Sequence, residues 1–157
     1  MPETVTVAAE AMATRFEVAL HGAPEAILRA AAEEALAEIT RLEGMLSIYR
    51  PTSEIAHINI RGAREPVRVS PEVFSLLEYC VALGEQTEGG FDITLAPLMR
   101  SWRFMNDSGA VPSDAALAEA RALCGWPQLR LDPEHTTVQL ATEGAMLDLG
   151  SYTIYSK

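Results

Sequence analysis

Three segments of the 157-residue sequence combine aromatic, charged, hydroxyl and glycine residues without the periodicity of a helix or a strand. The first is residues 47–55 (SIYRPTSEI), where Tyr49 offers a ring for stacking and Arg50 offers a guanidinium for a phosphate or carboxylate. Pro51 restricts the backbone beside them. The alternative interpretation is a connection between two helices, with Ser53 as the cap of the second.

The second segment is residues 89–94 (GGFDIT), where neither glycine has a Cβ, so backbone amides can approach a ligand closely. Asp92 adds an acceptor and Thr94 a hydroxyl. The alternative is the end of a helix followed by a strand. The third segment, residues 102–104 (WRF), predicts either a hydrophobic wall beside a ligand or a part of the core.

The common sequence signatures of dinucleotide, P-loop and zinc sites are absent from the sequence: GxGxxG, GxxxxGK, HExxH and CxxC. Two cysteines, Cys80 and Cys124, are too few for a disulfide framework or a four-cysteine zinc site. The histidines lie in three separate segments, at His21, His57 and His135, and no pattern joins them into a metal site.

Composition indicates an ordered globular chain, because 48% of the residues are hydrophobic and 22% are charged. With 22 acidic and 12 basic residues the net charge is −10, which disfavours nucleic acid and anionic membranes as partners. A nucleotide could bind such an acidic chain only if its negative charge were neutralised locally, most simply by a divalent cation.

No apolar run is long enough for a transmembrane helix, which needs about 18 residues. The N-terminus has neither the basic region nor the apolar region of a signal peptide. The sequence as written therefore predicts a cytoplasmic protein without a transmembrane segment, and an exported or lipid-anchored parent stays open.

The periodicity of apolar residues predicts three helices and five strands. We expect helices over residues 24–45, 70–88 and 113–123, the last with Gly125 as a left-handed cap, and strands over residues 4–7, 15–21, 129–131, 137–140 and 146–149. The signals are an apolar stripe in the first helix (Leu28, Ala32, Leu36, Ile39 and Leu42) with Gly44 near its end, the start Ser70–Pro71 of the second helix, and the alternating Phe16, Val18 and Leu20 of the second strand. This order favours an α+β fold with helices packed on a mostly antiparallel sheet. Residues 1–157 are expected to form a single domain. Because the sequence stops eight residues after the last strand, the domain is expected to be incomplete, truncated at its C-terminal end.

Taken in order, these segments closely resemble the FAD:protein FMN transferase family, the ApbE flavin transferases once called thiamine-biosynthesis lipoproteins. The resemblance rests on residues 11–16 (AMATRF), 41–43 (RLE), 46–55 (LSIYRPTSEI), Asn59, 89–94 (GGFDIT), 96–98 (APL), Trp102, Phe104 and 147–150 (LDLG). It runs from about Met12 to Gly150, and it marks this chain as the N-terminal portion of such a protein.

The sequence departs from the family at three points. Ala13 stands where the family usually has glycine, and Ile154 stands where a lysine is expected. The family's second half, with an aspartate and a threonine that bind magnesium, is missing from these 157 residues.

The resemblance implies a magnesium-dependent enzyme that cuts FAD, releases AMP and attaches FMN to a threonine of an acceptor protein, a redox subunit. FAD is then the substrate and Mg²⁺ the cofactor. Residues implied to bind FAD are Met12, Tyr49, Gly90, Phe91, Asp92 and Asp148, and the backbone carbonyl of Ser151 is implied to hold the metal. No catalytic base is identified.

Whether this chain itself is an enzyme is left open by the sequence, because most of the implied metal site is missing. We expect a truncated, inactive form of the transferase. The alternatives are a non-catalytic module that binds FAD or another flavin, and an inert fragment.

Overall fold

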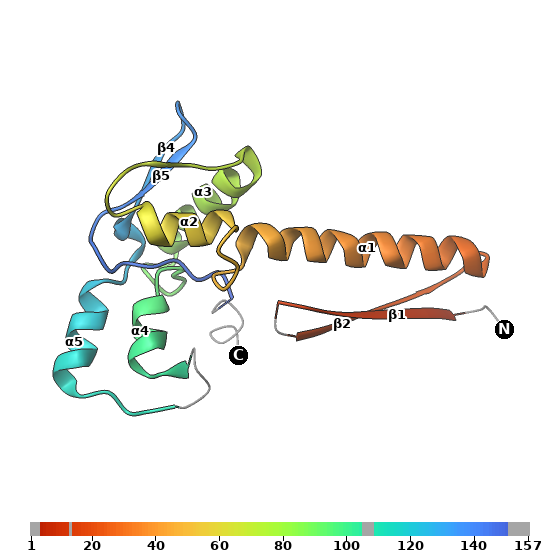
Figure 1. The fold of residues 1–157 in the computed structure, drawn as a ribbon, viewed down its shortest axis with the longest axis horizontal. Coiled ribbons are helices and arrows are strands. Elements are labelled where there is room, and N and C mark those ends of the chain that lie inside the picture. The colour runs from red at the N-terminus through yellow and green to blue at the C-terminus, as the bar shows by residue number, and fades with distance from the viewer. Residues whose placement is uncertain (1–3, 13, 105–108, 151–157) are drawn as a thin grey trace. The chain divides into compact units, whose positions relative to one another are not determined.

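The computed structural model describes residues 4–12, 14–104 and 109–150. The chain divides into two compact units, Met1–Met45 and Leu46–Lys157. Mixed helices and antiparallel strands make up the described residues, so the predicted α+β fold is confirmed (Figure 1).

The first unit begins with a hairpin of two antiparallel strands, β1 (Thr4–Ala11) and β2 (Thr14–His21). Side chains of β2 alternate between half-buried and exposed, and the half-buried ones are the predicted Phe16, Val18 and Leu20. Strand β1 is longer than residues 4–7 because its alanine-rich second half pairs with the start of β2, where Ala11 lies opposite Thr14. Cross-strand pairing thus overrides the weak strand propensity of alanine.

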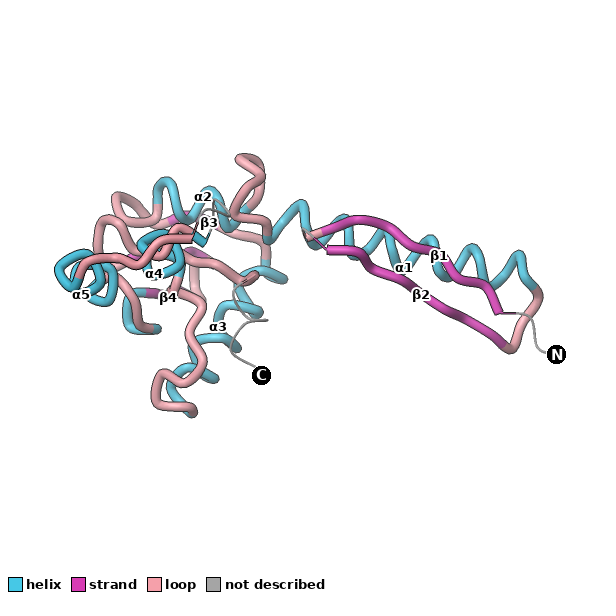
Figure 2. The backbone as a smooth tube through the Cα atoms, turned by 90° about the horizontal axis from the view of Figure 1, so that it is seen from below, coloured by secondary structure: helices cyan, strands magenta, loops and turns pink. Residues whose placement is uncertain are grey.

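Helix α1 (Glu25–Leu46) follows Pro24 and runs alongside this hairpin in both views (Figures 1 and 2). Its buried residues, Leu28, Ala32 and Leu36, are spaced by four, which places them on one face. The helix passes through Gly44, which was expected near its end; a Cβ there would meet no atom, so no close contact requires a glycine.

The second unit combines four α-helices, a short 3-10 helix and a three-stranded sheet among the residues described. The helices are α2 (Glu54–Arg61), α3 (Pro71–Gln86), α4 (Ala96–Ser101) and α5 (Asp114–Ala122), and the 3-10 helix is Trp126–Gln128. The strands are β3 (Val67–Arg68), β4 (Leu129–Asp132) and β5 (Thr137–Leu140), in the order β3-β5-β4 with both pairs antiparallel.

Serine side chains cap three helices of this unit, α2, α3 and α5, whereas α4 begins after Leu95 without a side-chain cap. Ser70 accepts a hydrogen bond from Val73 N at 3.3 Å, and Ser113 accepts one from Ala116 N at 3.3 Å. Helix α2 was foreseen only in the alternative interpretation of residues 47–55, which is confirmed because Ser53 caps it.

Two local predictions were wrong. Residues 146–149 form no strand, since the main chain of this segment is bonded by a side chain and a loop carbonyl instead of a neighbouring strand. Gly125 does not cap α5: Leu123 ends that helix, and Gly125, at φ 112° and ψ 133°, precedes the 3-10 helix in a conformation that residues with a Cβ rarely adopt.

The core of the second unit is formed by α2, α3 and β5. Its fully buried side chains include Ile55, Ile58, Leu77, Val138 and Leu140. No helix of the described residues has both the length and the apolar character needed to cross a membrane.

Candidate functional site

The loop after α3 is built around the hydroxyl of Thr87. This hydroxyl donates to Leu83 O at 2.7 Å and accepts from Phe91 N at 3.0 Å, while Gly90 N donates to Thr87 O at 2.9 Å. The glycine amides, which we expected to approach a ligand, therefore donate to the protein's own main chain: Gly89 N bonds Gly84 O in the last turn of α3 at 2.9 Å, and Gly90 N bonds Thr87 O.

Glycine is required in this loop for two different reasons. Gly89 has φ 82°, a conformation that residues with a Cβ rarely adopt. At Gly90 a Cβ would lie 3.1 Å from Thr87 O, closer than an ordinary contact. The predicted strand after the glycines is absent; the chain turns directly into α4.

Asp92 and Thr94 join this loop to a segment more than 30 residues away. One oxygen of Asp92, Oδ1, accepts from Thr94 N at 2.8 Å and from Thr94 Oγ1 at 2.6 Å. The other, Oδ2, accepts from Gly125 N at 3.0 Å, and Thr94 Oγ1 accepts from the same N–H at 2.7 Å. Thr94 is fully buried, so these bonds fix the loop from inside the protein.

Asp148 lies beside this loop. Its backbone N–H donates to Ile93 O at 2.8 Å, and its Oδ1 accepts from Gly150 N at 2.8 Å. The preceding residue, Leu147, is held by the side-chain amide of Asn59 in α2: Asn59 Nδ2 donates to Leu147 O at 2.9 Å, and Leu147 N donates to Asn59 Oδ1 at 2.7 Å. The fold thus brings Asp148 to residues 91–94, as the resemblance implied but no sequence spacing could show.

Tyr49 lies in a tight turn ahead of α2, and its side chain is 68% exposed. Tyr49 N donates to Ser47 Oγ at 3.2 Å. The turn is anchored by the fully buried Ser53, whose hydroxyl donates to Ser47 O and accepts from Ala56 N at 3.0 Å. The buried Ser53 therefore holds the turn that carries the exposed Tyr49 ring.

Met12 belongs to the first unit and follows β1 at the hairpin turn. It has φ 51°, uncommon for a residue with a side chain, and its side chain is 42% exposed. Met12 N donates to Glu43 Oε1 of α1 at 2.8 Å, which ties the hairpin turn to the helix.

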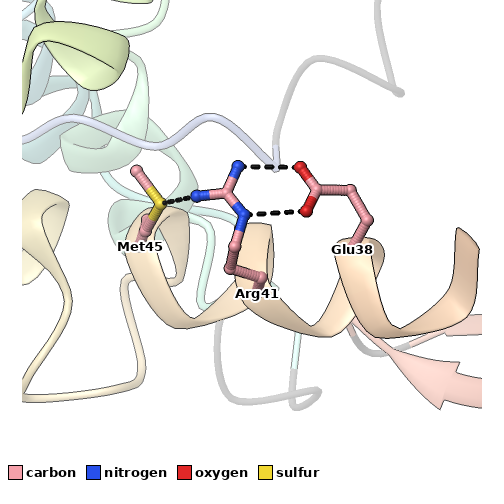
Figure 3. A network of polar contacts seen from close by, with 3 residues as sticks. All are labelled: Glu38, Arg41 and Met45. Atoms are coloured by element: carbon pink, nitrogen blue, oxygen red, sulfur yellow. Dashed lines mark hydrogen bonds and ion pairs between the residues drawn. The ribbon is translucent and has the colours of Figure 1, made fainter. Parts of the chain in front are cut away.

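Close to Glu43 in the sequence, Arg41 bridges two other residues of α1 (Figure 3). Its guanidinium donates to both carboxylate oxygens of Glu38, at 2.7 and 2.8 Å, and to Met45 Sδ at 2.8 Å. This hydrogen bond holds the pKa of Glu38 below its usual range. Because the pair is exposed, it orders the helix surface and adds little stability.

The aromatic residues of 102–104 contact one another. Trp102 and Phe104 stack with ring centroids 5.9 Å apart and an interplanar angle of 12°. Trp102 is half-buried and Phe104 is 52% exposed, so the pair lies at the surface rather than in the core.

A cavity of about 320 Å³ lies in the first unit, lined by Thr4, Val5, Thr6, Glu25 and Arg29. None of the predicted site residues lines it. Its two charged residues, Glu25 and Arg29, form an ion pair with each other at 3.0 Å, so the cavity gives no support to a second site.

The residues that the structure describes contain no group of three histidine, cysteine, aspartate or glutamate side chains that could hold a metal ion. Ser151, to which the resemblance assigned a metal contact, lies outside the described residues.

Sequence reasoning missed the structural roles of Asn59, Gly125 and Glu43. The sequence presents Asn59 and Glu43 only as parts of the motifs that carry the resemblance, and it presents Gly125 as a helix cap. Each acts on a residue at least 31 positions away, and no local pattern encodes such a pairing.

Three comparisons of this chain with known proteins point to the same family. A model of the ApbE family matches residues 12–153. An FAD:protein FMN transferase from Treponema pallidum is 34% identical to this chain, and the match covers 82% of this chain and 37% of that protein. Another from Klebsiella pneumoniae is 30% identical, and the match covers 87% of this chain and 45% of that protein. The crystal structure of the ApbE protein from Thermotoga maritima aligns with a TM-score of 0.86 at 26% identity, covering 95% of this chain and 48% of that one. The chain thus spans less than half the length of these relatives.

Proposed function

This chain belongs to the ApbE family, whose curated members are FAD:protein FMN transferases, and we propose that it is the N-terminal, FAD-binding part of such a transferase. The observation that carries the proposal is the family match from residue 12 to residue 153. Both units belong to this part, since the match begins in the hairpin of the first and continues through the second.

We propose that FAD contacts Met12, Tyr49, Gly90, Phe91, Asp92 and Asp148. The exposed ring of Tyr49 supports a stacking role, because a ring held on a buried anchor loses little freedom on binding. The bond from Asp148 N to Ile93 O supports a common site for Asp148 and the loop of residues 91–94. Met12 supports the proposal through its exposure and its unusual backbone conformation, a feature that often accompanies functional sites.

The proposed reaction moves the FMN group from FAD to a protein. The hydroxyl oxygen of an acceptor threonine forms a bond to the phosphorus of the FMN moiety, and the bond from that phosphorus to the bridging oxygen breaks. AMP leaves with the bridging oxygen, and the hydroxyl proton is released. Mg²⁺ supplies neutralisation of the diphosphate charge in such transfers.

The acidic character of this chain makes that neutralisation important, because its net charge of −10 repels a diphosphate. Among the described residues no three histidine, cysteine, aspartate or glutamate side chains gather where they could hold a metal ion. We therefore propose that the 157 residues alone bind FAD without transferring FMN, and that Mg²⁺-dependent transfer needs residues outside them.

Titration of the 157-residue chain with FAD, followed by flavin fluorescence, tests the binding proposal. We expect saturable binding that Asp148→Asn weakens and that Glu134→Gln, on the exposed β4–β5 turn, leaves unchanged. Absence of saturable binding would overturn the proposal.

A second assay tests the transfer proposal. The chain is incubated with FAD, Mg²⁺ and a threonine-bearing acceptor peptide, and the peptide is then weighed by mass spectrometry. We expect no added FMN; a modified peptide at appreciable rate would show that these residues suffice for transfer.

A further inference from the structure

We propose that Asn59 is a positioning residue for Asp148, acting through the main chain of Leu147. The inference rests on the proposed function, in which Asp148 contacts FAD. The side-chain amide of Asn59 bonds both main-chain groups of Leu147, the residue before Asp148, at 2.9 and 2.7 Å.

The two bonds resemble those that a neighbouring strand would supply. A side-chain amide offers a donor and an acceptor in one plane, and Leu147 presents its carbonyl and its N–H to both. Residues 146–149 form no strand, so this single side chain replaces a strand's pairing at Leu147. It does so across 88 positions of sequence.

Asn59 is itself held on a rigid platform. Helix α2 places Ile55 and Ile58 in the core with no exposed surface, and its first residue, Glu54, accepts a hydrogen bond from Ser70 N at the start of α3. At its end, Gly62 N donates to Ile58 O at 2.7 Å and Gly62 O accepts from Leu140 N of β5 at 2.9 Å. Because α2 is held firmly against the core, Asn59 is fixed in position and in turn fixes the main chain of Leu147.

The position of Asp148 follows from this arrangement. Leu147 is fully buried, and the next N–H, that of Asp148, bonds Ile93 O at 2.8 Å. The backbone around Asp148 is therefore fixed from two sides, by α2 and by the loop after α3. Because the backbone on both sides is fixed, the Asp148 side chain extends towards a ligand from one defined position.

Neither aspartate nor alanine can make the same pair of bonds at position 59. Aspartate keeps the acceptor for Leu147 N but places a charged oxygen against Leu147 O. Alanine leaves both main-chain groups without their partner in a part-buried position. Both substitutions should release Asp148 while leaving its own side chain intact.

The test compares Asn59→Ala and Asn59→Asp with Ile58→Val in the 157-residue chain. Ile58→Val removes one buried methyl from the same helix, so it lowers the melting temperature while keeping both hydrogen bonds between Asn59 and Leu147. Flavin fluorescence gives the Kd for FAD, and hydrogen exchange gives the protection of the Leu147 and Asp148 amides.

We expect Asn59→Ala to weaken FAD binding about 10-fold, as loss of a partner that orients a ligand-binding side chain commonly does in metal sites. Exchange of the Leu147 and Asp148 amides should accelerate. Asn59→Asp should retain more protection at Leu147 than Asn59→Ala and still bind FAD more weakly than the wild type. Ile58→Val should keep the wild-type Kd.

Two results separate this inference from the proposed function. A wild-type chain that binds no FAD overturns the proposed function and the inference with it. A wild-type chain that binds FAD, with an unchanged Kd in Asn59→Ala or an equal loss in Ile58→Val, overturns the inference alone.

Discussion

Asp92 accepts a hydrogen bond from the backbone N–H of Gly125, 33 residues further along the chain, at 3.0 Å. The same N–H also reaches the Thr94 hydroxyl at 2.7 Å, so a loop carboxylate and its neighbour hold the entry to the 3-10 helix. Asp92 therefore has a structural task, whatever else its carboxylate does.

Replacing Asp92 should destabilise the second unit. Asp92→Ala removes the acceptor of Thr94 N and Thr94 Oγ1 and one acceptor of Gly125 N, and leaving a buried donor unsatisfied costs about 1–3 kcal/mol. Asp92→Asn keeps Oδ1 for Thr94 and should lose less. Urea unfolding gives both free energies, and Glu134→Ala serves as the exposed control. Equal stability of Asp92→Ala and the control would contradict the structural role.

Replacing the capping serines should give unequal losses. Ser53→Ala removes the cap of α2 and the buried bond to Ser47 O, so we expect a loss above the ~1 kcal/mol typical of a cap. Ser113→Ala removes only an exposed cap bond of 3.3 Å and should lose less than that. Thermal and urea unfolding measure both; a larger loss for Ser113→Ala would be inconsistent with the anchoring of this turn.

Replacing Tyr49 should weaken FAD binding if its ring stacks on the ligand. We expect Tyr49→Ala to lose about 1–3 kcal/mol of binding free energy, by analogy with aromatic stacking on nucleic-acid bases. Tyr79 on α3 is a matched control, because it is exposed to 63% where Tyr49 is exposed to 68%. Flavin fluorescence titration measures both variants, and an unchanged affinity in Tyr49→Ala would remove Tyr49 from the site.

The stability of the protein should fall at high pH through Cys80. Burial raises the pKa of this thiol to about 11 from an ordinary value of 9.0. The folded state therefore holds the proton longer than the unfolded state, so the free energy of unfolding decreases as pH rises from about 9 towards 11. The decrease between pH 8 and 11 should be smaller in Cys80→Ala, measured by urea unfolding. Identical pH dependence in the two proteins would refute the shift.

The sequence by itself determined the elements whose signals are local. The apolar spacing of Leu28, Ala32 and Leu36 predicted α1, and the Ser70–Pro71 start predicted α3. Alternation of Phe16, Val18 and Leu20 predicted β2. These patterns are readable because burial of one face repeats with the period of the element. The family resemblance, confirmed by the match over residues 12–153, was likewise a property of residue order.

Only the tertiary structure decided how the site segments are held. Residues 146–149 looked like a strand because they are apolar and extended, yet Asn59 and Ile93 take the bonds that a strand would use. Gly125 looked like a cap because it follows a helix, yet its N–H donates to Asp92 and it begins the 3-10 helix instead. Such bonds join residues 33 to 88 positions apart, and their partners are chosen by the packing of the core and not by any local period.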